Sequence, residues 1–320
     1  MIWLSWRQQR LEALLGAGVL AALAALLILT GRHIDAFYNH AHLAACGLGR
    51  PQPSSCGDSV THFTIHYASL VNLTSWFNMV PLLIGILVAA PIVLDFEQGT
   101  HRLAWTQTIT SRRWLTTRLT LAGTLAVLAA VAFTLVMTWW RGPFDALSGR
   151  FDTSAFDFEG IVPIAYTLFA ASVVLAVGTI LRRTLPAVAI AIVSFLALRL
   201  GIEGWVRYQH YLHPLTRTWP VGTTAPPGEA NGYTTSSGLS FGGPPGAGRQ
   251  VIHACNVTQT DPRRLQAISS CLHHHHVLQY AIYQPASRFW TFQGIEASIF
   301  LALTLALVAI SVWWASHRLA

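Results

Sequence analysis

The sequence predicts an all-α polytopic integral membrane protein with six transmembrane helices. Of its 320 residues, 53% are hydrophobic and only 10% are charged, whereas about 25% are charged in a typical soluble domain. Six apolar stretches have the length, about 20 residues, that crosses a ~30 Å hydrocarbon core. All 20 basic residues are arginine, and they are denser in some of the connecting segments than in others. Together these observations indicate a chain that crosses a membrane repeatedly.

The six stretches give the expected helices in order. Because lipid offers no hydrogen bonds to the backbone, each stretch is expected to be helical. The fourth and fifth are separated only by residues 182–184, which predicts a tight helical hairpin. The first stretch is too long for the apolar part of a signal peptide and no A-x-A site follows it, so we expect a retained helix. The expected helices, within one transmembrane domain that covers 1–320, are at about 11–30, 76–94, 117–139, 161–181, 185–202 and 294–315.

The arginines predict which side each segment faces. With both termini inside, the inner segments total 42 residues and hold eight arginines, while the outer segments total 157 residues and hold ten. Arginine is enriched in cytoplasmic loops. The sequence therefore predicts an orientation with both termini inside, in a multi-pass protein of the bacterial cell membrane, and a large extracytoplasmic loop at 203–293.

The four cysteines support the same orientation. Cys46 and Cys56 fall in the first expected outer loop, and Cys255 and Cys271 fall in the last. Disulfides persist on oxidising faces of membranes. Pairing within each loop is the shortest of the three possible connectivities, and the alternative is four free thiols.

The outer loops hold the remaining soluble pieces. The first, 31–75, is expected to contain an amphipathic helix near the outer surface, because apolar residues recur at helical spacing over 59–75. His62 and His66 share a face of it, but no third ligand has matching spacing, so we predict no metal site. In the last loop, 208–215 and 262–283 could be helical on either side of a Gly- and Pro-rich stretch. The tract of four histidines at 273–276 is interpreted as a polar surface patch.

Charges within the expected spans would indicate a transport or catalytic site. Glu12, Arg118, Arg199 and Glu296 all lie near predicted helix ends, where they can extend to the membrane surface. No charged pocket is therefore expected. The absence of lysine also excludes a Walker-A phosphate loop and lysine nucleophiles. We expect no catalytic residue and no cofactor in this chain, and no binding to nucleic acid.

The only substantial inner segment is 95–117. Gly99 is expected to end the second transmembrane helix, and Thr100 can cap a short helix over 100–107. That helix would protrude between two spans and present Leu103, Trp105 and Thr106 to a cytosolic partner. The alternative is a segment that only anchors at the membrane interface.

The order of an acidic residue, then Glu97-x-Gly99-Thr100, then a short helix and a basic start of the next span resembles the permeases of the type-2 ATP-binding-cassette (ABC) transporter family. Segments 102–107, 112–114, 3–10 and 283–296 resemble an actinobacterial subgroup of that family. The expected six-helix architecture extends the resemblance over the whole chain. Family members more often have a short re-entrant element where this chain has its long last loop, so that loop departs from the pattern.

The resemblance implies a permease subunit, an exporter of hydrophobic or amphipathic compounds. ATP and Mg would bind a separate ATP-binding-cassette ATPase subunit, on which residues 97–107 dock as a coupling helix. It also implies a second permease copy, in a homodimer or a paralogous heterodimer, and an interfacial N-terminal helix contacting lipids through Trp3, Trp6, Arg7 and Arg10. The implied coupling residues are Glu97, Gly99, Thr100, Arg102, Leu103, Trp105, Thr106, Gln107, Arg112 and Arg113.

Two other functions remain open from the sequence. One is a membrane-anchored metal-binding or enzymatic protein that acts through the histidine-containing outer loop. The other is a membrane scaffold without transport. An ATP-binding-cassette gene beside this one, or an ATPase partner in a pull-down, would separate the permease from both.

Overall fold

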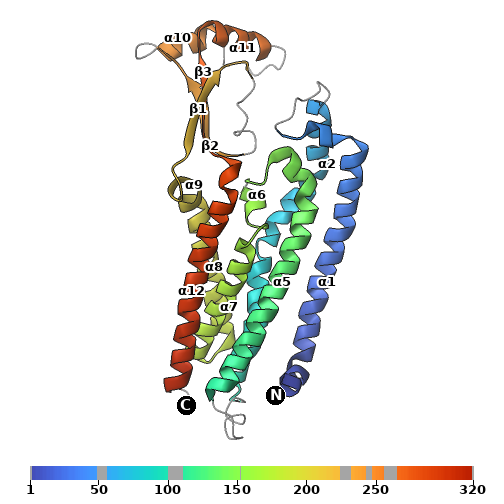
Figure 1. The fold of residues 1–320 in the computed structure, drawn as a ribbon, viewed down its shortest axis with the longest axis vertical. Coiled ribbons are helices and arrows are strands. Elements are labelled where there is room, and N and C mark those ends of the chain that lie inside the picture. The colour runs from blue at the N-terminus through green and yellow to red at the C-terminus, as the bar shows by residue number, and fades with distance from the viewer. Residues whose placement is uncertain are drawn as a thin grey trace.

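The computed structural model describes residues 2–48, 56–99, 111–151, 153–223, 232–242, 247–255 and 265–318. Within this part of the chain, six helical segments are long and apolar enough to cross a membrane. Both termini lie at one end of the helix bundle, and a small sheet with two short helices lies at the other (Figure 1). We call these the inner end and the outer end, following the orientation predicted from the sequence. The prediction of a mostly helical, six-span membrane protein is confirmed.

The first half of the bundle is built from long helices that run past the expected span ends. These are α1 (Ile2–His40), α2 (Cys56–Phe77), α3 (Val80–Glu97) and α5 (Ser111–Ser148), with the short 3-10 helix η1 (Leu43–Cys46) after α1. Helix α1 has 39 residues, about 58 Å at 1.5 Å per residue. It therefore extends well beyond a ~30 Å hydrocarbon core.

The segment expected as the outer loop 31–75 is largely helical, and the difference has a physical cause. Ile34 in the last third of α1 is completely buried, and the His33 imidazole lies 2.9 Å from the Tyr67 hydroxyl of α2. Phe63 and Tyr67 of α2 are also buried. The helix expected over 59–75 is therefore present as α2; one of its faces packs against α1, and it leads almost directly into α3.

The predicted interfacial residues at the N-terminus belong to the first helix. Trp3, Trp6, Arg7 and Arg10 lie in α1, which runs without interruption into the first span. Residues 2–15 contain no glycine or proline to break the helix, and most are good helix formers.

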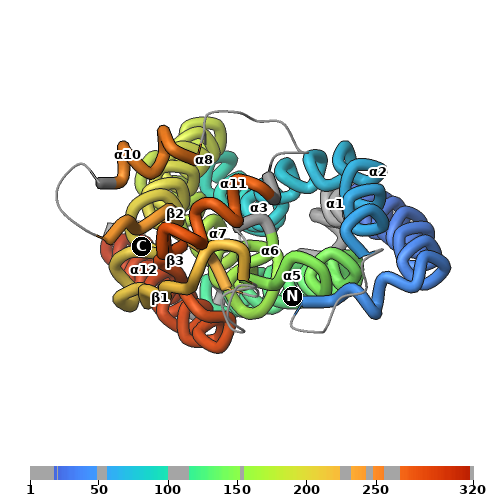
Figure 2. The backbone as a smooth tube through the Cα atoms, turned by 90° about the horizontal axis from the view of Figure 1, so that it is seen from above, coloured from blue at the N-terminus to red at the C-terminus, as the bar shows by residue number. Residues whose placement is uncertain are grey.

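The second half of the bundle contains α7 (Val162–Leu181), α8 (Thr184–Gly201) and α12 (Phe289–Arg318), preceded by the short α6 (Thr153–Phe156). Helix α8 continues into the π-helix η2 (Ile202–Val206) and α9 (Arg207–His210). Helix α7 is the most buried of the six candidate spans, and it packs against α3, α5, α8 and α12, as the view along the bundle shows (Figure 2). It is the central helix of the fold.

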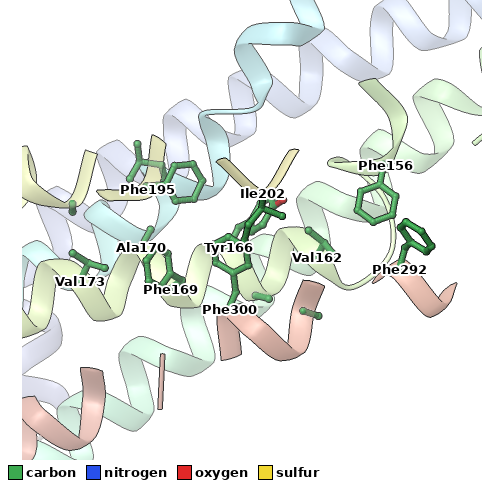
Figure 3. Packing of buried hydrophobic residues seen from close by; sticks show 14 of the residues in the cluster. Phe156, Val162, Tyr166, Phe169, Ala170, Val173, Phe195, Ile202, Phe292 and Phe300 are labelled. Atoms are coloured by element: carbon green, nitrogen blue, oxygen red, sulfur yellow. The ribbon is translucent and has the colours of Figure 1, made fainter. Parts of the chain in front are cut away.

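The main hydrophobic core surrounds α7. Tyr166, Phe169 and Ala170 meet Phe195 of α8 and Phe300 of α12 (Figure 3). The Phe300 ring lies edge-on to the Tyr166 ring with centroids 4.7 Å apart. A smaller cluster at the inner end joins α3, α5, α7 and α12 through Phe96, Leu115, Leu175 and Ala315.

Close approach of α3 and α7 depends on glycine. A Cβ atom placed on Gly85 would lie 2.7 Å from the Ala170 Cβ and 2.8 Å from the Ala171 nitrogen and the Thr167 oxygen. Two of these atoms belong to the α7 backbone and cannot move without moving the helix. Small residues at helix contacts provide close packing in membranes, where hydrophobic association is weak.

We expect Gly85→Ala to lower the free energy of unfolding by about 1–3 kcal/mol, because overpacking forces the two helices apart. The matched control is Gly123→Ala in α5, where an added Cβ meets nothing within 4 Å. Thermal unfolding of the detergent-solubilised protein measures both. Equal melting temperatures for the two variants would contradict the importance of the α3–α7 contact.

The last outer loop folds as a small α/β unit. Strand β3 (Leu278–Gln284) pairs antiparallel with β1 (Leu215–Pro220) on one side and β2 (Tyr233–Ser240) on the other. Helices α10 (Ala247–Ala254) and α11 (Leu265–His274) lie beyond the sheet, and the 3-10 helix η4 (Ala286–Arg288) returns the chain to α12 (Figure 1). The helices expected at 208–215 and 262–283 are therefore shorter than predicted. Residues 278–284 form a strand because Ala281 and Tyr283 bury one face against the rest of this unit.

Both expected disulfides are present. Cys46 pairs with Cys56 and joins η1 to the start of α2. Cys255 pairs with Cys271 and joins the end of α10 to α11. The alternative of four free thiols is excluded.

Candidate functional site

At the inner end, Glu97 ties the end of α3 to the start of α8. Its carboxylate accepts hydrogen bonds from the Thr184 backbone N–H at 2.8 Å and from the Thr184 hydroxyl at 2.6 Å. The first N–H groups of a helix have no partner within it, so Glu97 supplies one from another helix. The chain turns just after this contact at Gly99, whose φ of +71° is a conformation that glycine adopts readily.

A second contact fixes the other side of the same connection. Asp95 of α3 forms an ion pair with Arg118 of α5 at 3.0 Å, and Arg118 is almost fully buried. The helices on both sides of the inner segment are thus joined to each other and to the α7–α8 hairpin. Arg118 was expected to extend to the membrane surface; its ion pair with Asp95 holds it within the bundle.

Of the other predicted coupling residues, two lie in a described helix: Arg112 and Arg113 are in the first turn of α5. The remaining ones, Thr100, Arg102, Leu103, Trp105, Thr106 and Gln107, lie outside the described residues. Among the described residues, the contacts of Glu97 and Asp95 connect the inner ends of α3, α5 and α8.

The outer end contains a buried network of charges that the sequence analysis did not expect. At its centre is Arg207, which is completely buried. Its Nε and one terminal nitrogen donate to the two carboxylate oxygens of Glu296 at 2.8 and 2.7 Å. The same terminal nitrogen donates to Asp157 at 2.6 Å. The guanidinium also stacks over the Phe156 ring, 4.4 Å from its centroid.

Arg199 forms the second half of the network. It donates to the other oxygen of Asp157 at 2.7 Å and to the side chain and backbone oxygens of Asn78 at 2.6 and 2.9 Å. Asn78 lies in the break between α2 and α3, so this arginine joins that break to α8. The Tyr166 hydroxyl of α7 donates to Glu296 and also lies within hydrogen-bond distance of Asp157. The network thus joins α7, α8, α9 and α12 to the α2–α3 break and to the connection before α7.

The π-helix explains how both arginines reach the same site. In a regular α-helix with 3.6 residues per turn, positions eight residues apart lie about 80° apart around the axis. Arg199 and Arg207 are separated by eight positions, and the wider turn of η2 lies between them. The added backbone of a π-turn brings Arg207 round to the face that carries Arg199. Such turns are often found at functional sites.

The charges within this network compensate each other. Asp157 and Glu296 supply two negative charges, and Arg199 and Arg207 supply two positive charges. Burial raises the pKa of the Asp157 carboxyl, but the two arginine partners act in the opposite direction and leave it below its ordinary value. Asp157 is therefore ionised at neutral pH. Arg199 and Glu296 were expected to extend to the membrane surface, and that expectation is wrong because each finds its partners in the interior.

Gln293 and Gly160 hold the connection that carries Asp157. The Gln293 amide oxygen accepts hydrogen bonds from the backbone N–H groups of Ile161 and Val162 at 3.1 and 3.0 Å, and its nitrogen donates to the Phe156 carbonyl at 2.8 Å. Gly160 has a φ of +70°, and a Cβ there would lie 2.7 Å from that amide oxygen. Gln293, a fully buried side chain of α12, therefore caps α7 and positions the connection that carries Asp157.

The predicted histidine features are exposed. His62 and His66 stack against Phe37 on the outer part of the bundle, and all four histidines of 273–276 are on the surface. His275 lies near Cys255 and Cys271, but the two sulfur atoms are joined in a disulfide and are not available as metal ligands. No feature of the described residues favours an enzymatic or metal-binding role for this loop.

Comparison with known proteins places most of the bundle in a family. Residues 17–207 match the model of a family described as "ABC-2 membrane transporter related". The matched part includes Glu97, Tyr166 and both buried arginines. No curated protein matches the chain significantly, and neither does any solved structure. Because the match covers more than half of the sequence, the chain belongs to the ABC-2 membrane transporter related family.

Proposed function

We propose that this permease component of an ABC transporter exports hydrophobic or amphipathic compounds and is powered by a separate ATP-binding subunit. Family membership supports the permease and the need for an ATPase partner. The direction of transport and the class of cargo are our inference. The multi-pass membrane location follows from the same family and the six apolar helices, and we propose the bacterial plasma membrane.

The observation that carries the proposal is the contact between Glu97 and Thr184. A force applied to the segment after α3 would act through this carboxylate on the start of α8, and through the Phe96–Leu115 packing on α5. Movement of an ATPase docked on this segment would thus be transmitted through α3 to α5 and α8. Switching between states by movement of packed helices is a common mechanism in transporters.

We propose that ATP and Mg bind only the partner subunit. This chain contains no lysine, and a Walker-A loop requires one to contact the β- and γ-phosphates. A second permease copy, identical or paralogous, would complete the complex. The exposed apolar row Leu121, Leu125 and Leu128 on α5 is a surface on which lipid or that second copy could pack.

Co-purification tests the partnership directly. The chain is co-expressed with a candidate ATP-binding-cassette subunit from the same genome and isolated through a tag on the permease. We expect the ATPase to co-purify and the complex to hydrolyse ATP in nanodiscs. The control is the same complex with the Walker-A lysine of the partner changed to alanine, which should assemble without hydrolysis. Failure of the wild-type subunits to assemble would overturn the proposal.

A further inference from the structure

A small pocket at the outer end borders the buried charge network. It is formed where the π-helix η2 and α9 meet strand β2, and its volume is about 260 Å3. Its walls are mostly aromatic and polar: Glu203, Trp205, Tyr208, Gln209, Tyr233 and Thr235. Binding pockets for drug-sized ligands have about 300–1,000 Å3. This one is therefore large enough for a headgroup rather than for a whole drug-sized molecule.

Aromatic rings form two of its walls. Tyr208 and Tyr233 are stacked with their centroids 3.7 Å apart and their planes at 18°. Trp205 is 80% exposed, so its ring is available to a ligand. The faces of such rings carry negative electrostatic potential and attract cations, tryptophan most strongly.

Glu203 gives the pocket its charge. The side chain is half-buried, and within the described parts of the chain no residue forms a hydrogen bond or ion pair with it. Asp157, Glu296, Arg199 and Arg207 lie close enough to act on it electrostatically. Those four charges already compensate each other, so Glu203 leaves a net negative charge. A desolvated carboxylate without a partner favours a bound cation.

From this combination we propose that the pocket binds an ammonium group, quaternary or primary, with Glu203 as its counter-ion and Trp205 and the Tyr208–Tyr233 stack as its aromatic walls. Such a group occurs in soluble amines and in the headgroups of zwitterionic lipids, and both present the same chemistry to the pocket. The inference concerns binding alone. It is tested without the ATPase partner, so its failure would leave the proposed transport function standing.

Choline binding to the full-length protein in nanodiscs of phosphatidylglycerol provides the test. Choline is compared with 3,3-dimethyl-1-butanol, which has the same shape without the charge. We expect choline to bind, and both the neutral analogue and the variant Glu203→Gln to weaken binding at least about tenfold, as loss of a charged contact does. The control Asp58→Asn removes one exposed carboxylate from the other side of the outer end and should leave affinity unchanged.

Trp205 provides a second variant that is independent of the carboxylate. Because its ring is exposed, Trp205→Leu should not disturb folding. It should weaken choline binding, while Trp205→Phe should retain most of it. Equal affinity for choline and its neutral analogue, or unchanged binding in both Glu203→Gln and Trp205→Leu, would overturn the proposal.

A further experiment, with phosphatidylcholine, identifies the source of the ammonium group. Phosphatidylcholine is added to the nanodiscs, and choline binding is measured again. Competition by the lipid would assign the pocket to a headgroup, and its absence would assign the pocket to a soluble amine. If choline does not bind, retention of phosphatidylcholine over phosphatidylglycerol by the wild type but not by Glu203→Gln would still support the site. The proposal fails if neither probe binds.

Discussion

Replacing Arg207 with methionine should lower the free energy of unfolding by about 3–5 kcal/mol, the largest effect on stability that we expect from one substitution. Methionine retains much of the volume but removes every hydrogen bond to Glu296 and Asp157. These carboxylates would then be buried with a single arginine, Arg199. An uncompensated buried charge costs more than the ion pair itself contributes.

Thermal unfolding of the purified protein in detergent measures this loss. Arg217→Met is the matched control, because Arg217 is exposed on strand β1, and it should change the melting temperature little. The double variant Arg207→Met with Glu296→Gln removes one charge of each sign. It should recover a large part of the stability if charge compensation is the cause. An Arg207→Met protein as stable as the wild type would show that the network carries little energy.

Replacing Glu97 with alanine should reduce ATP-driven export at least about tenfold while the ATPase still co-purifies. The substitution removes the carboxylate oxygen that accepts both hydrogen bonds from Thr184 and so disconnects α3 from α8. The other residues predicted to contact the ATPase are unchanged. Glu97→Gln keeps one amide oxygen as an acceptor and should retain part of the activity. Export is followed with an amphipathic fluorescent compound that the wild-type complex moves.

Gly99→Pro provides an independent change at the same turn. Gly99 has positive φ, which proline cannot adopt, so the segment that follows must leave α3 in another direction. We expect export to fail in this variant as well. Export at wild-type rates in both Glu97→Ala and Gly99→Pro would refute the coupling role of residues 97–107.

The sequence was sufficient to predict features that depend on local pattern. The six spans follow from apolar length, and the two disulfides follow from short separations within one loop. Helix ends were predicted less well. Polar segments such as 31–40 continue a helix when a few residues, Ile34 among them, find partners on another helix. That depends on tertiary packing, which composition does not contain.

The buried charge network could not have been recognised from the pattern. Arg207 and Glu296 are 89 residues apart. A regular helical period would place Arg207 on a different face from Arg199, because the π-helix that brings the two together has no signal in the sequence. The only signal in the sequence is that Arg199, Arg207 and Glu296 all occur at the outer ends of spans. The sequence did not predict the strands, because β2 is rich in serine and threonine and has no alternation of apolar and polar residues. Residues 233–240 are extended because they pair with β3.

The two disulfides also have a consequence for how the protein is made. Their cysteines are only 10 and 16 residues apart, and the entropy of closing such short loops is small. In the orientation predicted from the arginines, both cysteines of a bridge cross the membrane within the same translocated segment during synthesis. Each bridge can therefore be oxidised soon after its own segment emerges, before later spans are inserted. Biogenesis of the outer end then needs a thiol oxidase but little disulfide isomerase activity, because the correct partner is also the nearest one.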